Sequence, residues 1–482
     1  MHVCLIAEGS YPYVTGGVGK WTHDLIASIP EAEFTVVALW PGPGSHGEPK
    51  YPRLPNVREI RHVWLFSGAM SKKPVPAEAY AKLESFHRRI KEGDPGGFKD
   101  ALASVHGGAI LKDPAAWELL GKLYETGAPH GTSLADYYWT FRATHEPLFR
   151  VLGAELPKAD VVHTISTGYA GLLGAAHRQR TGTPLVTTEH GLYTKERAHE
   201  LWDAEWIPGE IRSQLRREPN FFRDWWRRMF EGMERVTYAA SDLLITLFEE
   251  NRRYQISRGA PEERTRVIPN GVDLQVFDEV RRRRAGNGHV EVGLVGRVVP
   301  IKDVKTFIDA GRTIVSRLGK ERVKLSVVGP TEEDETYAAQ CREMTALAGL
   351  DGCLTFTGRV DARKYYEKLD VMVLTSLSEG QPLAVLEALA CGIPVVAPDV
   401  GSCRELLEGR LGEDAGVGPA GVVTLPVDAA QTAEAVVRLA EDAALRKAMG
   451  DAGRRRVERF YRLEQVGRAY LDLYREASRG RR

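Results

Sequence analysis

The sequence predicts an α/β protein made of two doubly wound domains, each built on a parallel sheet, that face each other across a cleft. The chain has 482 residues, which is enough for two to three domains. Short apolar runs rich in β-branched residues alternate with helical patterns, as is typical of parallel α/β architecture. The alternation breaks at Val272–Gly288, a polar stretch that contains glycine and that we interpret as a linker between the domains.

The expected strands are the apolar runs themselves. In the first half of the chain they are His2–Ala7, Phe34–Leu39, Asp160–Ile165, Leu185–Thr188 and Asp242–Leu247. In the second half they are Val290–Val295, Val323–Val328, Cys353–Phe356, Val371–Thr375, Pro394–Ala397 and Gly421–Leu425. Each run is short, which favours a strand over a helix.

Two regions depart from the alternation. Residues from about Ser67 to Phe149 are polar with helical character, so they are expected to form a helical insertion in the first domain. The end of the chain, Ala429–Ser478, is expected to form successive helices.

The composition excludes several classes of protein. Hydrophobic residues make up 43% and charged residues 27%, as in an ordinary soluble globular protein. The 65 basic and 65 acidic residues cancel, so no overall field favours nucleic acid. The basic runs Arg281–Arg284 and Arg454–Arg456 are therefore expected to be solvated helix or linker faces.

The cysteines and the N-terminus predict a cytoplasmic protein. Cys4, Cys341, Cys353, Cys391 and Cys403 lack metal-ligand spacing, so they are expected to be buried free thiols in a reducing compartment. The N-terminus lacks a charged region and an apolar core long enough for a secretion signal. No window approaches 18 consecutive apolar residues. An association with the inner face of the cell membrane is compatible with these features.

The most informative segment is Ser378–Cys391, SEGQPLAVLEALAC, which carries Glu379 and Glu387 with seven residues between them. If a helix begins near Leu383, Glu379 lies in the loop before it and Glu387 about one turn inside it. Free backbone N–H groups and the positive end of the helix dipole collect at this point. Such a site suits a ligand with a phosphate and several hydroxyls, as in a nucleotide-sugar. The alternative is an ordinary strand–turn–helix with solvated acids.

Glu379-x7-Glu387 resembles the paired-glutamate motif of the retaining family-4 glycosyltransferases. Three further segments are similar to elements of that family and occur in the expected order. They are EGSYPYVTGGVGK at Glu8–Lys20, PNGVD at Pro269–Asp273 and GRVVPIKD at Gly296–Asp303. Together with TEHGLYTKER at Thr188–Arg197, the first of these most resembles the Pel-type (PelF-like) exopolysaccharide glycosyltransferases, which are biofilm enzymes.

The resemblance spans nearly the whole chain and implies the GT-B fold. It implies an N-terminal Rossmann-like acceptor-side domain at 1–275 with the insertion at about 67–149. A C-terminal Rossmann-like nucleotide-sugar domain would occupy 276–460, and a helix at 461–482 would return to the first domain. The implied activity is retaining hexosyl transfer from a UDP-sugar, such as UDP-glucose, to a growing exopolysaccharide or other glycan. Membrane-embedded synthase subunits are implied partners, and nucleic acid is not.

The diphosphate of such a donor must be neutralised. No Asp-x-Asp ends a predicted strand, and Glu332–Glu335 is interpreted as an acidic helix start, so no metal site is expected. Arg297 and Lys302 instead follow an expected strand and match the family's phosphate clamp. Arginine offers a planar fork and lysine a compact charge, and with helix-end partial charges they offset most of the diphosphate charge. The alternative is a surface pair with no ligand.

By resemblance, Glu387 accepts ribose hydroxyls, Glu379 accepts hydroxyls of the transferred sugar, and backbone N–H groups from Gly380, Gln381 and Leu383 complete the donor contacts. Pro382 departs from the family, which commonly has glycine there, and it removes one N–H donor.

In the first domain, Gly16 and Gly17 allow close approach of backbone to a phosphate. His190 is expected to lie beside the donor sugar, with a backbone-bonded core histidine as the alternative. Lys195 and Arg197 are candidates for phosphate or acceptor contacts, whereas His163 is expected to be structural.

The segment Phe221–Met233, FFRDWWRRMFEGM, has an apolar helical stripe with arginines on the other face. Membrane or acceptor docking is one interpretation, and packing against the sheet is the preferred one.

No pair of acids is placed as nucleophile and acid of a retaining hydrolase. A front-face reaction therefore fits best, in which the leaving diphosphate takes the acceptor's proton. Three alternatives remain: an inverting or epimerising GT-B enzyme, a sugar phosphorylase, and a non-catalytic nucleotide-sugar-binding subunit of a polysaccharide synthase.

Overall fold

The computed structural model divides the chain into two compact units. The first unit contains Met1–Ile268 and Arg468–Arg482, and the second contains Pro269–Gly467. This division falls before the predicted boundary at 275/276. The structure describes residues 1–67, 77–92, 94, 98, 102, 114–204, 206–208, 220–284, 288–409 and 416–480.

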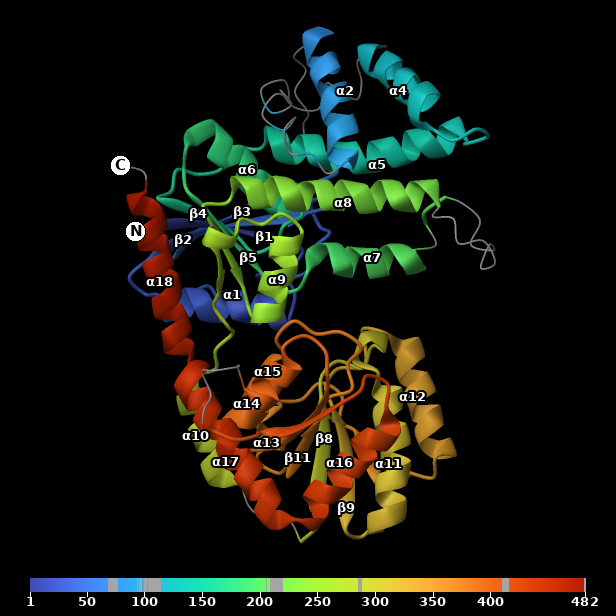
Figure 1. The fold of residues 1–482 in the computed structure, drawn as a ribbon, viewed down its shortest axis with the longest axis vertical. Coiled ribbons are helices and arrows are strands. Elements are labelled where there is room, and N and C mark those ends of the chain that lie inside the picture. Colours follow the sequence, from blue (N-terminus) through green and yellow to red (C-terminus); the bar gives the residue numbers. More distant parts are fainter. Residues whose placement is uncertain are drawn as a thin grey trace. The chain divides into compact units, whose positions relative to one another are not determined.

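The first unit is built on a seven-stranded parallel sheet with the order β3-β2-β1-β4-β5-β6-β7 (Figure 1). The strands are β1 (His2–Glu8), β2 (Glu33–Trp40), β3 (Val57–Trp64), β4 (Val161–Thr164), β5 (Leu185–Glu189), β6 (Leu243–Thr246) and β7 (Thr265–Val267). The order reverses beside β1, because the chain moves outward to β2 and β3 and then returns to β4 on the other side. The carboxyl ends of β1 and β4 therefore meet at a topological switch point.

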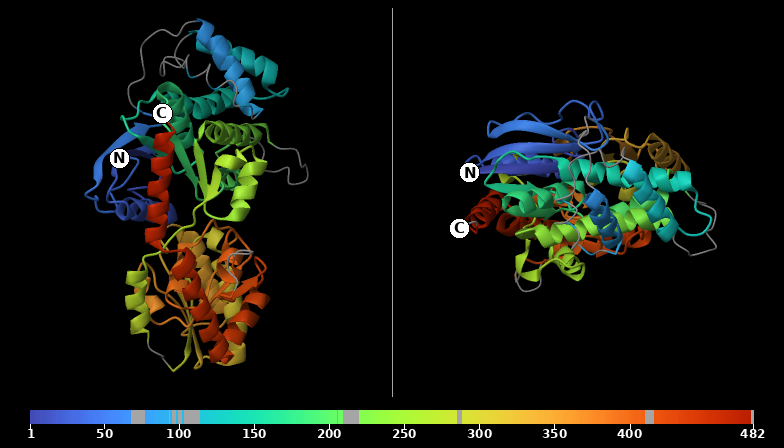
Figure 2. Two further views of the ribbon diagram at one scale, coloured as in Figure 1. Left: turned by 60° about the vertical axis from the view of Figure 1, so that its left-hand side comes forward. Right: turned by 90° about the horizontal axis from the view of Figure 1, so that it is seen from above.

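Helices cover this sheet on both faces. They are α1 (Gly17–Ser28), α2 (Ala77–Lys91), α4 (Pro114–Gly127), α5 (Leu134–Gly153), α6 (Tyr169–Thr181), α7 (Tyr193–Asp203), α8 (Phe221–Ala240), α9 (Glu249–Ser257) and, from Arg468 on, α18 (Leu463–Arg479). Cys4 and Ile6 of β1 lie in the core that contains α5, α6 and α8. On the opposite face, His163 and Thr188 contact Tyr474 and Tyr470 of α18, which lies beside these strands in Figure 2.

The predicted insertion is helical where it is described. Helices α2, α4 and most of α5 fall in it, and α5 continues to Gly153, beyond the predicted end. Other parts of the insertion lie outside the described residues. The buried side chains of α2 and α4, such as Phe86 and Leu120, belong to the same core as β1, so this region extends the first unit rather than forming a separate core.

The apolar stripe of Phe221–Met233 is buried, but not in the way predicted. Trp225, Met229 and Met233 lie in the core, in a helix whose neighbours are α2, α5, α6 and α7 (Figure 1). The prediction of packing against the sheet was wrong because the insertion helices supply a second layer over α8. The stripe is covered, which also removes the basis for a membrane-docking role.

The second unit has a six-stranded parallel sheet with the order β10-β9-β8-β11-β12-β13. The strands are β8 (Val290–Val295), β9 (Val323–Val328), β10 (Leu354–Phe356), β11 (Val371–Val373), β12 (Val395–Pro398) and β13 (Gly421–Thr424). All six expected strands of the second half are confirmed within two residues at each end. The switch point lies between β8 and β11.

The side chains of this sheet alternate between two cores. Val371 and Val373 face one core, which also contains α11 (Val304–Leu318), α12 (Glu335–Leu347) and α16 (Ala429–Glu441). Met372 and Leu374 face the other, which contains α10 (Leu274–Arg283), α13 (Arg363–Tyr366), α14 (Leu383–Ala390), α15 (Cys403–Glu408) and α17 (Ala443–Phe460). Because strand side chains alternate, a strand buried on both faces is a continuous apolar run. The α/β prediction is confirmed.

Two expectations were wrong in detail, and two strands were not predicted. The linker expected at Val272–Gly288 contains helix α10, whose Phe277 and Val280 are buried. Strands β3 and β7 were missed. Of the basic runs, Arg454 and Arg456 are buried rather than solvated, at 6% and 1% exposure. Arg456 donates to the backbone carbonyls of Leu406, Leu407 and Gly418, so its charge is satisfied by peptide dipoles.

The five cysteines are buried free thiols, as predicted. Within the described part of the chain, no helix combines the length and the apolar character that crossing a membrane requires.

Candidate functional site

The candidate site of the second unit lies where β8 and β11 end. Ligands of doubly wound sheets bind at the carboxyl ends of the strands, at the switch point. Arg297 and Lys302 follow β8, and Glu379, Gly380 and Gln381 follow β11. Because β8 and β11 are neighbours in the sheet, their two loops are held side by side. The fold thus brings together two motifs that are far apart in the sequence.

Hydrogen bonds fix the turn that carries Lys302. Pro300–Lys302 forms a short 3₁₀ turn, and Asp303 follows in the left-handed region with φ 44°. The backbone N–H of Leu377 donates to the carbonyl of Ile301 at 2.9 Å. The hydroxyl of Thr375 donates to the carbonyl of Lys302 at 3.0 Å. The backbone of the lysine turn is therefore tied to the loop that leads to Glu379.

Lys302 and Glu379 form an ion pair. Nζ of Lys302 lies 2.5 Å from Oε1 of Glu379, and the side chains are only 20% and 10% exposed. Partial burial makes this pair stronger than a surface salt bridge, because water screens it less. The structure thus places the predicted phosphate cation and the predicted sugar acceptor in direct contact.

Arg297 lies apart from this pair. Its guanidinium forms an ion pair with Glu333, and both side chains are close to half exposed. Glu333 belongs to the acidic segment Glu332–Glu335, which starts α12 with Asp334 as the N-cap, as interpreted from the sequence. Arg297 and Lys302 are each matched with a carboxylate, so the two cations are separated in this structure.

Glu387 lies inside α14, which begins at Leu383 as predicted. The hydroxyl of Tyr366 donates to its Oε2 at 3.0 Å, and the same hydroxyl lies 3.3 Å from the carbonyl of Ala384. Burial and the neighbouring Glu387 raise the pKa of Tyr366, so this hydroxyl remains a donor. Tyr366 comes from α13, and no local pattern around Glu387 indicated this contact.

The loop before α14 is held from two sides. The side-chain oxygen of Gln381 accepts from the backbone N–H of Asn270 at 2.5 Å, and the Asn270 amide donates to the carbonyl of Gln381 at 3.0 Å. The carbonyl of Gly380 accepts from the backbone N–H of Ser402 at 2.9 Å. Gly401, with φ 54°, lies so close that a Cβ would sit 2.2 Å from the carbonyl oxygen of Glu379. Asn270 and Gly401 were not predicted as site residues.

In the first unit, Gly16 and Gly17 start α1 beyond the end of β1. A Cβ added at either residue would meet no described atom within 4 Å, so the backbone faces open space. The first N–H groups of a helix have no partner inside the helix. This segment can therefore present backbone donors to an anion.

His190 follows β5 and packs edge-on against Trp21, with the ring centroids 4.2 Å apart. Its Nε2 is buried and has no hydrogen-bond partner among the described residues. Burial lowers the pKa of His190 to about 3, so the imidazole is neutral near pH 7. An unpartnered buried polar atom is unfavourable, which marks this nitrogen as a candidate ligand contact.

The other polar candidates have partners within the first unit. His163 is fully buried, and its two ring nitrogens bond the hydroxyls of Tyr474 and Thr188, each at 2.8 Å, which confirms a structural role. Lys195 lies over the ring of Tyr254, and Arg197 donates to Glu200. Among the residues that the structure describes, no group of three or more His, Cys, Asp or Glu side chains could hold a metal ion.

The buried His163 predicts a loss of stability in acid. Burial lowers its pKa to about 3 from 6.5, so the unfolded chain takes up the proton first as the pH falls. The contribution of neutral His163 to the free energy of unfolding should be complete above pH 6.5. Between pH 6.5 and 3 it should decrease by up to about 1.4 kcal/mol per pH unit. Urea unfolding of the full chain at pH 7.5 and pH 4.5 measures this. His163→Gln should show a smaller decrease, and an equal decrease in both proteins would contradict the assignment.

The comparisons with known proteins agree with this architecture. Residues 289–442 match the family described as "Glycosyl transferases group 1". The structure is similar to sucrose-phosphate synthase from Thermosynechococcus elongatus, with a TM-score of 0.60, 20% identity and 98% of each chain covered. It is also similar to Anabaena HepE in complex with UDP, with a TM-score of 0.60, 16% identity, and 99% and 100% of the two chains covered. These comparisons show the GT-B fold, and residues 289–442 of the second unit are similar to group 1 glycosyltransferases.

Residues 1–263, more than half of the 482, match a second family, described as a domain of unknown function (DUF3492). The chain belongs to this family.

Among curated proteins, a D-inositol 3-phosphate glycosyltransferase of Geodermatophilus obscurus is 31% identical over 51% of this chain and 53% of its own length. An MMP alpha-(1->4)-mannosyltransferase of Mycolicibacterium hassiacum is 28% identical over 68% of this chain and 73% of its own length. The chain spans 53% and 65% of the first two curated relatives that it matches.

Proposed function

We propose that this protein is a retaining glycosyltransferase that moves a hexose from a UDP-sugar to a glycan acceptor. Glucose is the proposed sugar and a growing exopolysaccharide the proposed acceptor. The group 1 match of residues 289–442 and the glycosyltransferase relatives support the reaction class. The Pel-type resemblance of Glu8–Lys20 and Thr188–Arg197 supports the acceptor class.

The observation that carries the proposal is the ion pair between Lys302 and Glu379 at the switch point of the second sheet. A partly buried lysine beside a carboxylate, with a second glutamate inside the next helix, offers one cation and two hydroxyl acceptors within one pair of loops. A nucleotide-sugar has the matching groups: a diphosphate, sugar hydroxyls and ribose hydroxyls. An ordinary structural ion pair would not need Glu387 in a helix that begins at this loop.

Each residue then has a chemical role. Lys302 and Arg297 bind the diphosphate, which requires Arg297 to leave Glu333 and Lys302 to leave Glu379. Glu379 then accepts hydroxyls of the transferred sugar, and Glu387 accepts those of the ribose. Backbone N–H groups of Gly380, Gln381 and Leu383 add donor contacts. Gly16, Gly17 and His190 of the first unit are proposed substrate contacts, His190 through its unpartnered Nε2.

In the proposed reaction, the bond between the anomeric carbon and the UDP oxygen breaks, and the acceptor oxygen bonds to that carbon from the same face. The acceptor's proton goes to the departing phosphate oxygen. Lys302 and Arg297 stabilise the charge that grows on that oxygen as the bond breaks. Because leaving and entering groups share one face, the configuration at the anomeric carbon is retained.

UDP-glucose is the first donor to test, because HepE, a fold neighbour, was solved with UDP-glucose. Purified protein should release UDP when given UDP-glucose and oligosaccharide acceptors, and nuclear magnetic resonance of the product should show a retained anomeric configuration. GDP- and ADP-glucose serve as controls for the nucleotide. An inverted product would refute retention. Tight binding of UDP-sugars without turnover on any acceptor would identify a non-catalytic synthase subunit instead.

The two side chains proposed to bind the diphosphate, Lys302 and Arg297, predict a transfer reaction that needs no divalent metal. With Lys302, Arg297 and helix-end N–H groups on the diphosphate, the leaving group is neutralised by the protein itself. Turnover in excess EDTA should stay within about twofold of turnover in Mg²⁺ or Mn²⁺, since one lost cationic contact would cost about 10²-fold or more. A strict requirement for either metal would refute this part of the proposal.

A further inference from the structure

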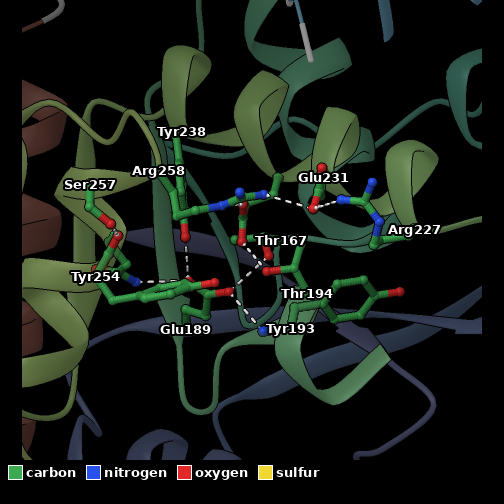
Figure 3. Close-up of polar contacts among 12 residues, drawn as sticks. Thr167, Glu189, Tyr193, Thr194, Arg227, Glu231, Tyr238, Tyr254, Ser257 and Arg258 are labelled. Carbon is green, nitrogen blue, oxygen red and sulfur yellow. Dashed lines mark hydrogen bonds and ion pairs between the residues drawn. The ribbon is translucent and has the colours of Figure 1, made fainter. Parts of the chain in front are cut away.

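The carboxylate of Glu189, at the end of β5, is held by a network of donors from four segments (Figure 3). Its Oε1 accepts from the hydroxyl of Thr167 at 3.0 Å and from the backbone N–H of Tyr193 at 3.0 Å. Its Oε2 accepts from the hydroxyl of Tyr238 and from the side-chain amide of Gln255, each at 2.8 Å. The side chain is 1% exposed.

One of these bonds closes a ring around His190. Glu189 precedes His190, and Tyr193 is the first residue of α7, so the bond from the Tyr193 N–H to Glu189 spans the turn 190–192. The N-cap residue of α7, Leu192, supplies no side-chain cap, and Glu189 takes one of the helix's unpartnered N–H groups in its place. The carboxylate thereby fixes the path of the turn that carries the imidazole.

The rest of the network holds the start of α7 in place. The hydroxyl of Tyr193 donates to Glu8 at 3.1 Å, and the hydroxyl of Thr194 donates to Glu234 at 2.7 Å. Glu234 is 0% exposed and also accepts from Arg258 at 3.1 Å. Three buried or half-buried carboxylates therefore hold the first turn of α7, but only Glu189 also spans the His190 turn.

A core that needed only packing would not require such a group, because a buried carboxyl is costly unless all its bonds are made. Here all four bonds are made, and they converge on the residue next to the only buried imidazole nitrogen of the described chain that lacks a partner. Burial raises the pKa of Glu189 while the four donors oppose the rise, so the bonds favour the ionised form.

We propose that Glu189 is a positioning residue that acts through His190: its hydrogen bonds fix the 190–192 turn, so that Nε2 of the neutral imidazole, packed against Trp21, points at the substrate. This inference rests on the proposed function, in which His190 contacts the nucleotide-sugar. Glu189 itself touches no substrate in this scheme.

The test is a double-mutant cycle in the full chain. In Glu189→Gln, the group loses its charge, and its NH₂ opposes the Tyr193 N–H in one orientation. In the other orientation it keeps its bonds only if the Gln255 amide and the Tyr238 hydroxyl both reverse. With UDP-glucose, kcat should fall at least tenfold while the Kd for UDP stays within about threefold. In a His190→Ala background, Glu189→Gln should cause no further fall in kcat. An equal fall in both backgrounds would show a structural role and overturn the proposal.

Glu234→Gln is the matched control. It neutralises a buried carboxyl that contacts the same helix but does not span the His190 turn. It should leave kcat within about threefold even where it lowers the melting temperature as much as Glu189→Gln does. A tenfold fall in kcat for Glu234→Gln would overturn the specific role of Glu189.

A readout without turnover separates this inference from the proposed function. In protein labelled at histidine Cε1, the signal that disappears in His190→Ala is that of His190. Glu189→Gln should shift or broaden this signal, and Glu234→Gln should not. If the wild-type protein transfers no sugar, the proposed function fails while this result still decides the positioning role. An unchanged His190 signal in Glu189→Gln would overturn it.

Discussion

Replacing Lys302 with alanine should reduce kcat for sugar transfer by about 10²- to 10³-fold, the usual effect of removing one preorganised contact to a developing charge. Lys302 follows β8 at the switch point, and its side chain is only 20% exposed. Its turn is tied to the β11 loop through Thr375 and Leu377, so the charge is placed by the backbone before any ligand binds. No other described lysine is paired with Glu379.

Two further variants show whether the charge is responsible. Lys302→Met keeps most of the aliphatic stem, so it should lose as much activity as Lys302→Ala if the ammonium group matters and less if packing matters. Lys305→Ala removes a half-buried lysine of α11 that donates to Gln340, and it should keep near-normal turnover. Initial rates with UDP-glucose measure all three. Near-normal turnover of Lys302→Ala would remove the basis of the proposed diphosphate site.

The parts of the fold that the sequence predicted are those buried on both faces. Val371–Val373 is a continuous apolar run, and Val323–Val328 is apolar except for Lys324 and Ser326, because helices cover both sides of the second sheet. Strand β3, VREIRHVW, was missed because it lies at the edge of its sheet and has charged and half-exposed residues. Helix α10 was missed because its arginines suggested a linker, although Phe277 and Val280 fall three apart on one buried face.

The candidate site was predictable where motifs are local. The position of Glu387 in α14 follows from a helix-forming run after a turn, and the loop positions of Lys302 and Glu379 follow from strands that end nearby. Contacts between distant segments were not predictable from one sequence. The bond from Tyr366 to Glu387 and the close approach of Gly401 to Glu379 depend on how α13 and α15 pack, which local patterns do not encode. The hydrogen bonds to Glu189 also join segments that are distant in the sequence, so they were not predictable either.

Replacing Glu387 with alanine should weaken UDP binding by about 10²- to 10⁴-fold, because a carboxylate that accepts two ribose hydroxyls contributes about 1.5–3 kcal/mol through each bond. The structural cost should be modest. Tyr366 loses one acceptor but remains 3.3 Å from the carbonyl of Ala384. Calorimetric titration with UDP measures the loss, and the melting temperature without nucleotide reports on the fold. Tyr366→Phe keeps the carboxylate and should change UDP affinity by less than about tenfold.

The ribose assignment can be separated from a general electrostatic effect by removing hydroxyls from the ligand instead of the protein. A negative Glu387 near the diphosphate would weaken binding, so a purely electrostatic role predicts that Glu387→Ala binds UDP more tightly. A role in hydroxyl recognition predicts that the wild-type protein discriminates against 2′,3′-dideoxy-UDP and that Glu387→Ala does not. The two changes act on the same bonds, so their effects should not add. Additive effects would place the ribose elsewhere and leave Glu387 as the acceptor of the Tyr366 hydroxyl.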